Sequence, residues 1–111
     1  MTTDLTDMTA AVHLFRSLAD PARLAIVRLL AAGEHRVVDL AAQVGLAQST
    51  VSGHLSCLRD CGLVTARVEG RASLYSLTRP ELSELLVAAE KLLTATGEAV
   101  SLCSTYGRDT D

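Results

Sequence analysis

The spacing of apolar residues changes from a helical repeat to a strand-like alternation only once along this chain. Before Gly62, apolar residues recur every three or four positions, as in Val12, Phe15 and Leu18. Between residues 63 and 77 two short runs typical of strands flank Glu69-Gly70-Arg71, which predicts a β-hairpin. Helical spacing resumes after Pro80. The pattern predicts a mainly α fold with one small hairpin.

Composition limits how such a chain builds its core. The 111 residues suit one domain, and they are 49% hydrophobic but only 3% aromatic. Leu, Val, Ile and Ala must therefore fill the core, which favours packed helices. No apolar run approaches the roughly 20 residues that a membrane helix needs, and the first residues are polar and acidic. We expect a cytoplasmic protein with no membrane partner, whose three cysteines are free thiols or metal ligands.

Start and stop signals divide the chain into five expected helices and a tail. Asp20-Pro21 is a helix start, and Gly33, Gly45 and Gly62 are helix ends. The predicted helices cover about 9–18, 21–32, 38–44 and 48–61, and a fifth begins near Pro80; strands are predicted at 63–68 and 73–77, with a polar connector at 34–36. We expect one domain over residues 1–95 and a C-terminal tail over 96–111.

Residues 38–61 have the pattern of a DNA-binding helix-turn-helix. A short helix, a glycine turn and a second helix rich in small polar residues allow the second helix to enter a major groove. The net charge is −3, but residues 41–80 carry four Arg against two acidic residues. Arginines in the following hairpin make this a winged version. The candidate DNA-binding residues are Gln48, Ser49, Thr50, Ser52, Gly53, His54, Arg59, Arg67 and Arg71. The alternative is a pair of packed helices without a DNA role.

Five segments resemble the ArsR/SmtB family of winged-helix repressors. They are residues 18–24, 39–41, 48–55, 58–64 and 67–77, and they occur in the family's order within about residues 9–95. The resemblance implies a homodimeric winged helix-turn-helix repressor with about five helices and a β-wing. It also implies that the first and last helices form the dimer interface. The two recognition helices would then bind successive major grooves of operator DNA, roughly 34–36 Å apart.

Two of the three cysteines lie on the predicted recognition helix. Cys57 and Cys61 are four residues apart, which in a helix places both on one face with Cβ atoms roughly 5–6 Å apart. Two thiolates at that spacing can bind one soft metal ion. Cys103 lies in the tail.

The metal sites known in the family narrow this assignment. Residues 36–39 lack the thiols of the arsenic-type site, the last helix lacks His, and no Cys precedes Cys57. What remains resembles the cadmium- and lead-sensing CmtR branch, which implies a three-thiolate site made of Cys57, Cys61 and Cys103. The branch also implies that Cys103 comes from the other protomer; the sequence leaves open which chain donates it. Three sulfurs suit Cd(II) or Pb(II) better than a closed Zn(II) site, although Zn(II) and arsenite remain possible.

The sequence therefore predicts a metal-responsive transcriptional repressor. A thiol redox or persulfide sensor, or an arsenite sensor, on the same fold is the main alternative. The sequence has no Cys-X-X-Cys, no phosphate-binding loop and no paired carboxylates in an expected cleft. We therefore do not expect an enzyme such as a thiol transferase. A helical interaction module is a further alternative.

Overall fold

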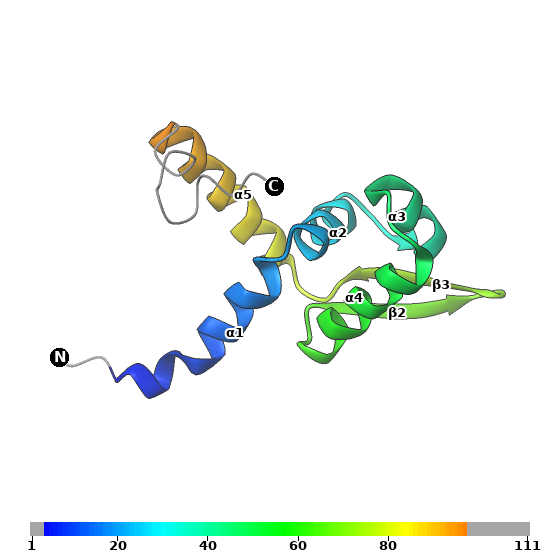
Figure 1. Cartoon of the computed structure of the whole chain (residues 1–111), viewed down its shortest axis with the longest axis horizontal. Helices are drawn as coiled ribbons and strands as arrows, with labels where there is room; N and C mark the ends of the chain where they lie inside the picture. Colours follow the sequence, from blue (N-terminus) through cyan, green and yellow to red (C-terminus); the bar gives the residue numbers. More distant parts are fainter. Residues whose placement is uncertain (1–3, 98–111) are drawn as a thin grey trace.

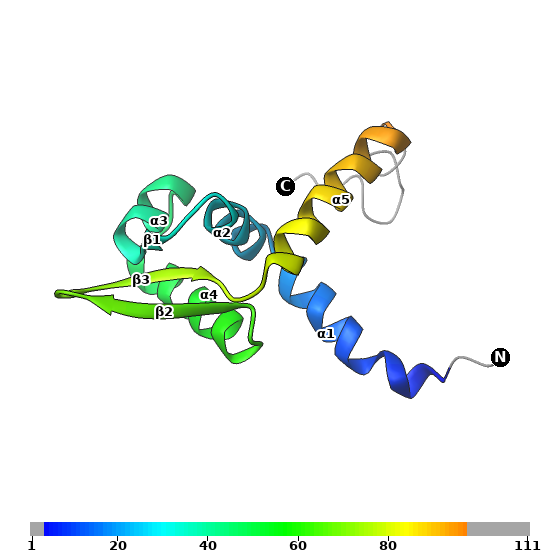
Figure 2. The ribbon, with the colours of Figure 1, turned by 180° about the vertical axis from the view of Figure 1, so that it is seen from behind.

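The computed structural model of the chain describes residues 4–97 and has a compact helical body from which two helices diverge (Figure 1). Its elements are the 3₁₀ helix η1 (Leu5–Met8), α1 (Thr9–Leu18), α2 (Pro21–Ala31), β1 (His35–Arg36), α3 (Val37–Val44), α4 (Gln48–Asp60), β2 (Val64–Glu69), β3 (Ala72–Leu77) and α5 (Pro80–Thr96). Helices α2, α3 and α4 pack with the sheet, while α1 and α5 leave the same end of this body (Figure 2). The predicted five helices and hairpin are confirmed.

The predicted connector at residues 34–36 was wrong, because it contains a third strand. The sheet order is β1-β3-β2, and His35 and Arg36 pair antiparallel with Tyr75 and Leu74 of β3. A two-residue strand is too short to show an alternating pattern. It forms because β3 would otherwise expose a row of unpaired backbone groups along one edge.

Three residues of α4 anchor it to the core. Val51, Leu55 and Leu58 have no exposed surface, as predicted from their spacing, and they pack in one cluster with Ile26 and Leu40. Each such side chain contributes roughly 1.5–3 kcal/mol when it is fully buried. The opposite face of α4 is therefore held toward solvent.

A glycine follows each of the two helices of the helix-turn-helix. Gly45 ends α3 at a φ of 75°, a left-handed conformation that glycine adopts without strain. Gly62 has a φ of 77° and follows α4, while the N–H of Leu63 donates to the carbonyl of Leu58. Helix α4 ends at Asp60, with Cys61 as its C-cap, one residue earlier than predicted.

The turn between α1 and α2 is fixed by hydrogen bonds from both sides. Asp20 caps α2 by accepting from the backbone N–H of Arg23 at 3.1 Å. The Arg23 side chain reaches back and donates from Nε to the carbonyl of Ser17 at 2.7 Å. These bonds satisfy groups that helix ends otherwise leave unpaired. We call this region, residues 16–23, the α1–α2 junction.

Helices α1 and α5 keep large apolar side chains in contact with solvent. Phe15 on α1 is 58% exposed and Leu92 on α5 is 63% exposed. Val12, Val87 and Leu93 are exposed on the same two helices, and Leu82 is the only buried residue of α5. None of the helices in residues 4–97 has the length and apolar character that crossing a membrane requires.

The Asp20 cap makes the stability of the fold depend on pH. The N–H of Arg23 lowers the pKa of Asp20, opposed by partial burial and assisted by the charges of Arg23 and His54. Because the folded-state pKa lies below the unfolded value of about 3.9, the cap stabilises the fold above that pH. Its contribution is lost as pH falls through the folded-state pKa.

We expect Asp20→Ala to lower the free energy of unfolding by about 0.5–2 kcal/mol at pH 7. The difference from wild type should shrink as pH falls below the unfolded-state pKa of about 3.9. Asp20→Asn, which retains a capping oxygen, is the matched control and should keep most of the stability at pH 7. Urea titrations between pH 7 and pH 2 measure all three proteins. A difference between wild type and Asp20→Ala that does not depend on pH would contradict a contribution of the carboxylate charge to the cap.

Candidate DNA interface and thiol site

The core-facing residues of α4 determine where its other side chains point. At about 100° per residue, Ser49 and Gly53 lie nearly opposite the buried residues Val51, Leu55 and Leu58. Gln48, Thr50, Ser52 and Arg59 are exposed around them, as is expected of a surface that reads DNA. Ala47 provides no side-chain cap at the start of α4, so the first backbone N–H groups remain open to an external acceptor such as phosphate.

Neither the packing nor the backbone conformation at Gly53 requires a glycine. It lies in the middle of an exposed helix, and an added Cβ would meet nothing within 4 Å. Glycine at such a position costs roughly 0.5–1 kcal/mol relative to alanine. The bare backbone instead leaves room for close approach by another molecule.

His54, Cys57 and Cys61 lie along one side of α4, which we call the junction flank. Their spacing of three and then four residues places them in a row. His54 is half-buried and close enough to Asp20 for its charge to contribute to the lowered pKa of that carboxyl, after the main effect of the Arg23 N–H. His54, which the sequence predicted to bind DNA, therefore lies near the α1–α2 junction.

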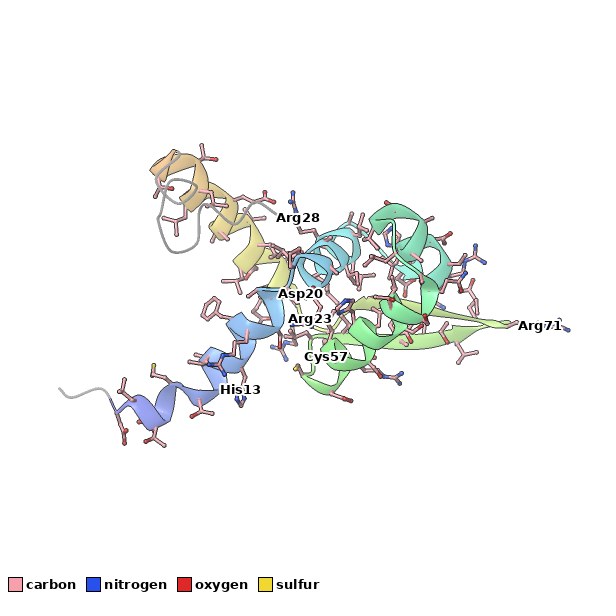
Figure 3. The ribbon with its side chains drawn as sticks, viewed as in Figure 1. His13, Asp20, Arg23, Arg28, Cys57 and Arg71 are labelled. Carbon is pink, nitrogen blue, oxygen red and sulfur yellow. The ribbon has the colours of Figure 1, made fainter. Side chains whose placement is uncertain are left out.

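Both described cysteines are free, exposed thiols. Cys61 Sγ lies 3.4 Å from the Ser17 hydroxyl of α1, and that hydroxyl donates to the carbonyl of His13 at 3.0 Å. Since the hydroxyl has one hydrogen, the Cys61 thiol is the donor to Ser17. Figure 3 shows Cys57 at the end of α4 nearest the α1–α2 junction. The thiols thus lie where the recognition helix meets α1.

Two of the three predicted metal ligands, Cys57 and Cys61, lie within the described residues. Cys103 lies outside the described residues, and no three Cys, His, Asp or Glu side chains within residues 4–97 are grouped closely enough to hold a metal ion. The described part therefore supplies two thiols at most, with no third Cys, His, Asp or Glu side chain placed to complete a metal site with them. That donor set fits a soft ion, with at least one ligand from elsewhere.

The two wing arginines have different surroundings. Arg71 lies at the tip of the β2–β3 hairpin (Figure 3). Arg67 donates from Nε and Nη2 to both carboxylate oxygens of Glu34, at 2.8 and 2.9 Å, and from Nη1 to Glu69 at 2.8 Å. Hydrogen bonding by Arg67 lowers the pKa of Glu34. Within the described chain, no carboxylate forms a salt bridge with Arg59 or Arg71.

Sequence reasoning missed Ser17 and Glu34, which contact predicted site residues. Ser17 is the only buried polar residue among residues 4–97. In the sequence it is a single serine in an amphipathic helix, and no motif there distinguishes it from an exposed serine. Glu34 lies 33 residues from Arg67, and no local pattern signals that pairing. The only signal in the sequence that Ser17 is buried was its position next to Leu18, a predicted core residue.

Comparison with known proteins identifies the family. The profile described as "Bacterial regulatory protein, arsR family" matches residues 20–66. The chain is 38% identical over 98 residues to a probable mercury resistance operon repressor of Streptomyces lividans, covering 88% of this chain and 77% of that protein. The chain belongs to the ArsR family. The HTH-type transcriptional regulator CmtR of Mycobacterium tuberculosis is 47% identical over 78 residues, which cover 70% of this chain and 66% of CmtR.

Solved structures of ArsR-type regulators share the fold. The crystal structure of M. tuberculosis Rv0081 matches with a TM-score of 0.75 and 38% identity, covering 86% of this chain and 94% of that one. The homodimeric winged helix-turn-helix domain of Mb0332 from Mycobacterium bovis matches with a TM-score of 0.77 and 28% identity, covering 87% and 92%. This ArsR-family chain is therefore a winged helix-turn-helix transcriptional regulator and not an enzyme.

The environment of Gly53 predicts opposite effects on folding and on DNA binding. We expect Gly53→Ala to raise the free energy of unfolding by roughly 0.5–1 kcal/mol. The same substitution should weaken DNA binding, because the new methyl group occupies space needed for close approach. Urea unfolding measures the first effect. Fluorescence anisotropy with a duplex obtained by in vitro selection on the wild-type protein measures the second.

Ser83→Ala on α5 is the control for Gly53→Ala, since it adds helix propensity away from α4. It should leave DNA affinity unchanged. A Gly53→Ala protein that is more stable and binds DNA as tightly as wild type would remove Gly53 from the interface.

Proposed function

We propose that this ArsR-family protein is a metal-responsive transcriptional repressor. The metal-free dimer binds operator DNA, and Cd(II) or Pb(II) bound to Cys57, Cys61 and Cys103 releases it. The observation that carries this proposal is the position of two exposed free thiols, one in the last turn of α4 and one at its C-cap, on the helix whose outer face carries the candidate DNA-binding residues. A ligand bound by these thiols acts directly on the recognition helix.

The donor chemistry supports soft ions as inducers. Thiolates prefer thiophilic ions, and a closed structural Zn(II) site usually has four protein ligands. Cys57 and Cys61 can hold an ion from the junction flank, and Cys103 of the tail would supply a third sulfur. The similarity to a probable mercury resistance operon repressor also favours a thiophilic ion. Zn(II) and arsenite are the competitors to test.

The contact between Cys61 and Ser17 provides a route from the thiols to the rest of the protein. The Ser17 hydroxyl contacts the thiol of Cys61 at the end of α4, and the Ser17 carbonyl accepts a hydrogen bond from the side chain of Arg23 in α2. A change at Cys61 therefore reaches the α1–α2 junction without passing through a flexible loop. Coupling between metal and DNA is reciprocal, and it typically changes each affinity about 5–150-fold.

The exposed apolar residues of α1 and α5 support a homodimer formed by these two helices. Phe15, Val87 and Leu92 would otherwise stay in water, at a cost proportional to their apolar area. The homodimeric relative Mb0332 has the same fold. A two-fold dimer would present two copies of α4 to successive major grooves of a palindromic operator.

A thiol redox or persulfide sensor on the same fold is the second candidate. The observation in its favour is the exposure of both described thiols to solvent oxidants. A disulfide between Cys57 and Cys61 would be strained, because they are one helical turn apart. Oxidation would therefore join one of them to Cys103.

A metal titration tests the proposed sensor. We expect Cd(II) and Pb(II) to weaken binding of the selected duplex about 5–150-fold in the wild-type protein. Cys57→Ser and Cys61→Ser should abolish release, and Cys103→Ser should reduce it strongly, while all three bind DNA normally without metal. Anisotropy with Cd(II), Pb(II), Zn(II) and arsenite gives the response, and the metal–thiolate absorption band reports binding independently.

A Cys103→Ser protein that still releases DNA normally with Cd(II) would remove the tail from the sensor. Release by mild oxidation, reversed by a reductant and absent with every metal, would favour the redox candidate.

A substitution in the exposed face of α1 tests the dimer. We expect Phe15→Glu to raise the dimer dissociation constant by at least about tenfold, because a charge replaces an apolar contact at the interface. Val68→Glu is the matched control on the wing, where Val68 is also exposed. Analytical ultracentrifugation measures both, and a Phe15→Glu protein that remains dimeric at the wild-type concentration range would exclude this face.

A further inference from the structure

Arg67 connects the two outer edges of the sheet. It lies opposite Leu74 of β3, and Leu74 lies opposite Arg36 of β1, so β3 separates Arg67 from the β1 edge. The Arg67 side chain nevertheless reaches Glu34, immediately before β1, and holds both of its carboxylate oxygens. Glu69, two residues along β2 and on the same side of the strand, binds the remaining nitrogen.

We infer that Arg67 is a positioning residue that fixes the wing to the body, and that Arg71 supplies the DNA contact of the wing. All three guanidinium nitrogens of Arg67 already donate to carboxylates. The group formed by Arg67, Glu34 and Glu69 has a net charge of −1, so it repels a phosphate instead of attracting it. Two of its five N–H groups remain without a carboxylate, but a phosphate that bound them would lie beside two carboxylates that already hold the same guanidinium.

The bonds between Arg67 and Glu34 lie where the wing leaves the body of the protein. Beyond Arg67, β2 and β3 pair only with each other, through Val68 with Ser73 and Glu69 with Ala72. An isolated two-stranded ribbon is marginally stable in water. The bidentate bond to Glu34 ties the ribbon to the end of α2, through the loop at Gly33. The wing can then hold Arg71 at a fixed distance from α4.

The inference rests on DNA binding by the proposed repressor but not on its metal sensor. All measurements therefore use the metal-free, full-length protein. The variants are Arg67→Gln and Glu34→Gln, which each break the bridge, and Arg71→Gln, which leaves it intact. Hydrogen exchange of peptides covering β2 and β3 reports the wing without DNA. Anisotropy with the selected duplex over a range of salt concentrations reports the phosphate contacts.

We expect Arg67→Gln and Glu34→Gln to speed amide exchange in the wing about 2–5-fold, as is usual for loss of a partly exposed ion pair. Arg67→Gln should leave the slope of log affinity against log salt unchanged. Arg71→Gln should leave wing exchange unchanged and reduce that slope by about one per protomer. A slope reduced equally by Arg67→Gln and Arg71→Gln would overturn the inference, as would wild-type wing exchange in both bridge variants. Failure of metal to release DNA would refute the proposed sensor and leave these results intact.

Discussion

Burial of Val51, Leu55 and Leu58 fixes how α4 is presented to every other molecule. These side chains are fully buried among the core residues, so α4 cannot rotate about its axis without exposing them. Exposing all three to water would cost several kcal/mol, a large part of the stability of a typical small domain. The outward position of Gly53 and the lateral position of the thiols both follow from this one constraint.

The fixed orientation of α4 leaves it two exposed sides with different chemistry. The side opposite the core carries small polar residues and an unobstructed glycine, which suit a groove of DNA. The junction flank carries His54, Cys57 and Cys61, and it faces the Asp20 cap and the Ser17 hydroxyl. In the proposed mechanism, a ligand on the thiols therefore acts without entering the DNA groove, by disturbing how α4 lies against the α1–α2 junction.

Local sequence signals predicted most of the fold because each has a local physical cause. Asp20-Pro21 marks the start of α2, and Gly45 and Gly62 supply left-handed residues that end helices. The buried residues of α4 followed from helical spacing alone. Strand β1 did not, because two residues carry no period and their pairing with β3 depends on an edge formed by residues 72–77. The bonds of Arg67 to Glu34 and of Ser17 to Cys61 span 33 and 44 residues, so only the folded chain reveals them.

Not every arginine of the basic segment is available to DNA, because some form salt bridges within the chain. The four arginines of residues 41–80 suggested a positive surface, yet Arg67 and Arg79 are bound to carboxylates of the same chain. Among the arginines of this segment, all within the described residues, only Arg59 and Arg71 lack such a salt-bridge partner. One lies near the end of α4 and the other at the wing tip, so the free positive charges lie on the two elements that a winged helix-turn-helix brings to DNA. A protein with a negative net charge can therefore still present positive charge at these two places, because carboxylates of the same chain pair with Arg67 and Arg79 and leave Arg59 and Arg71 without such a partner in the described part of the chain.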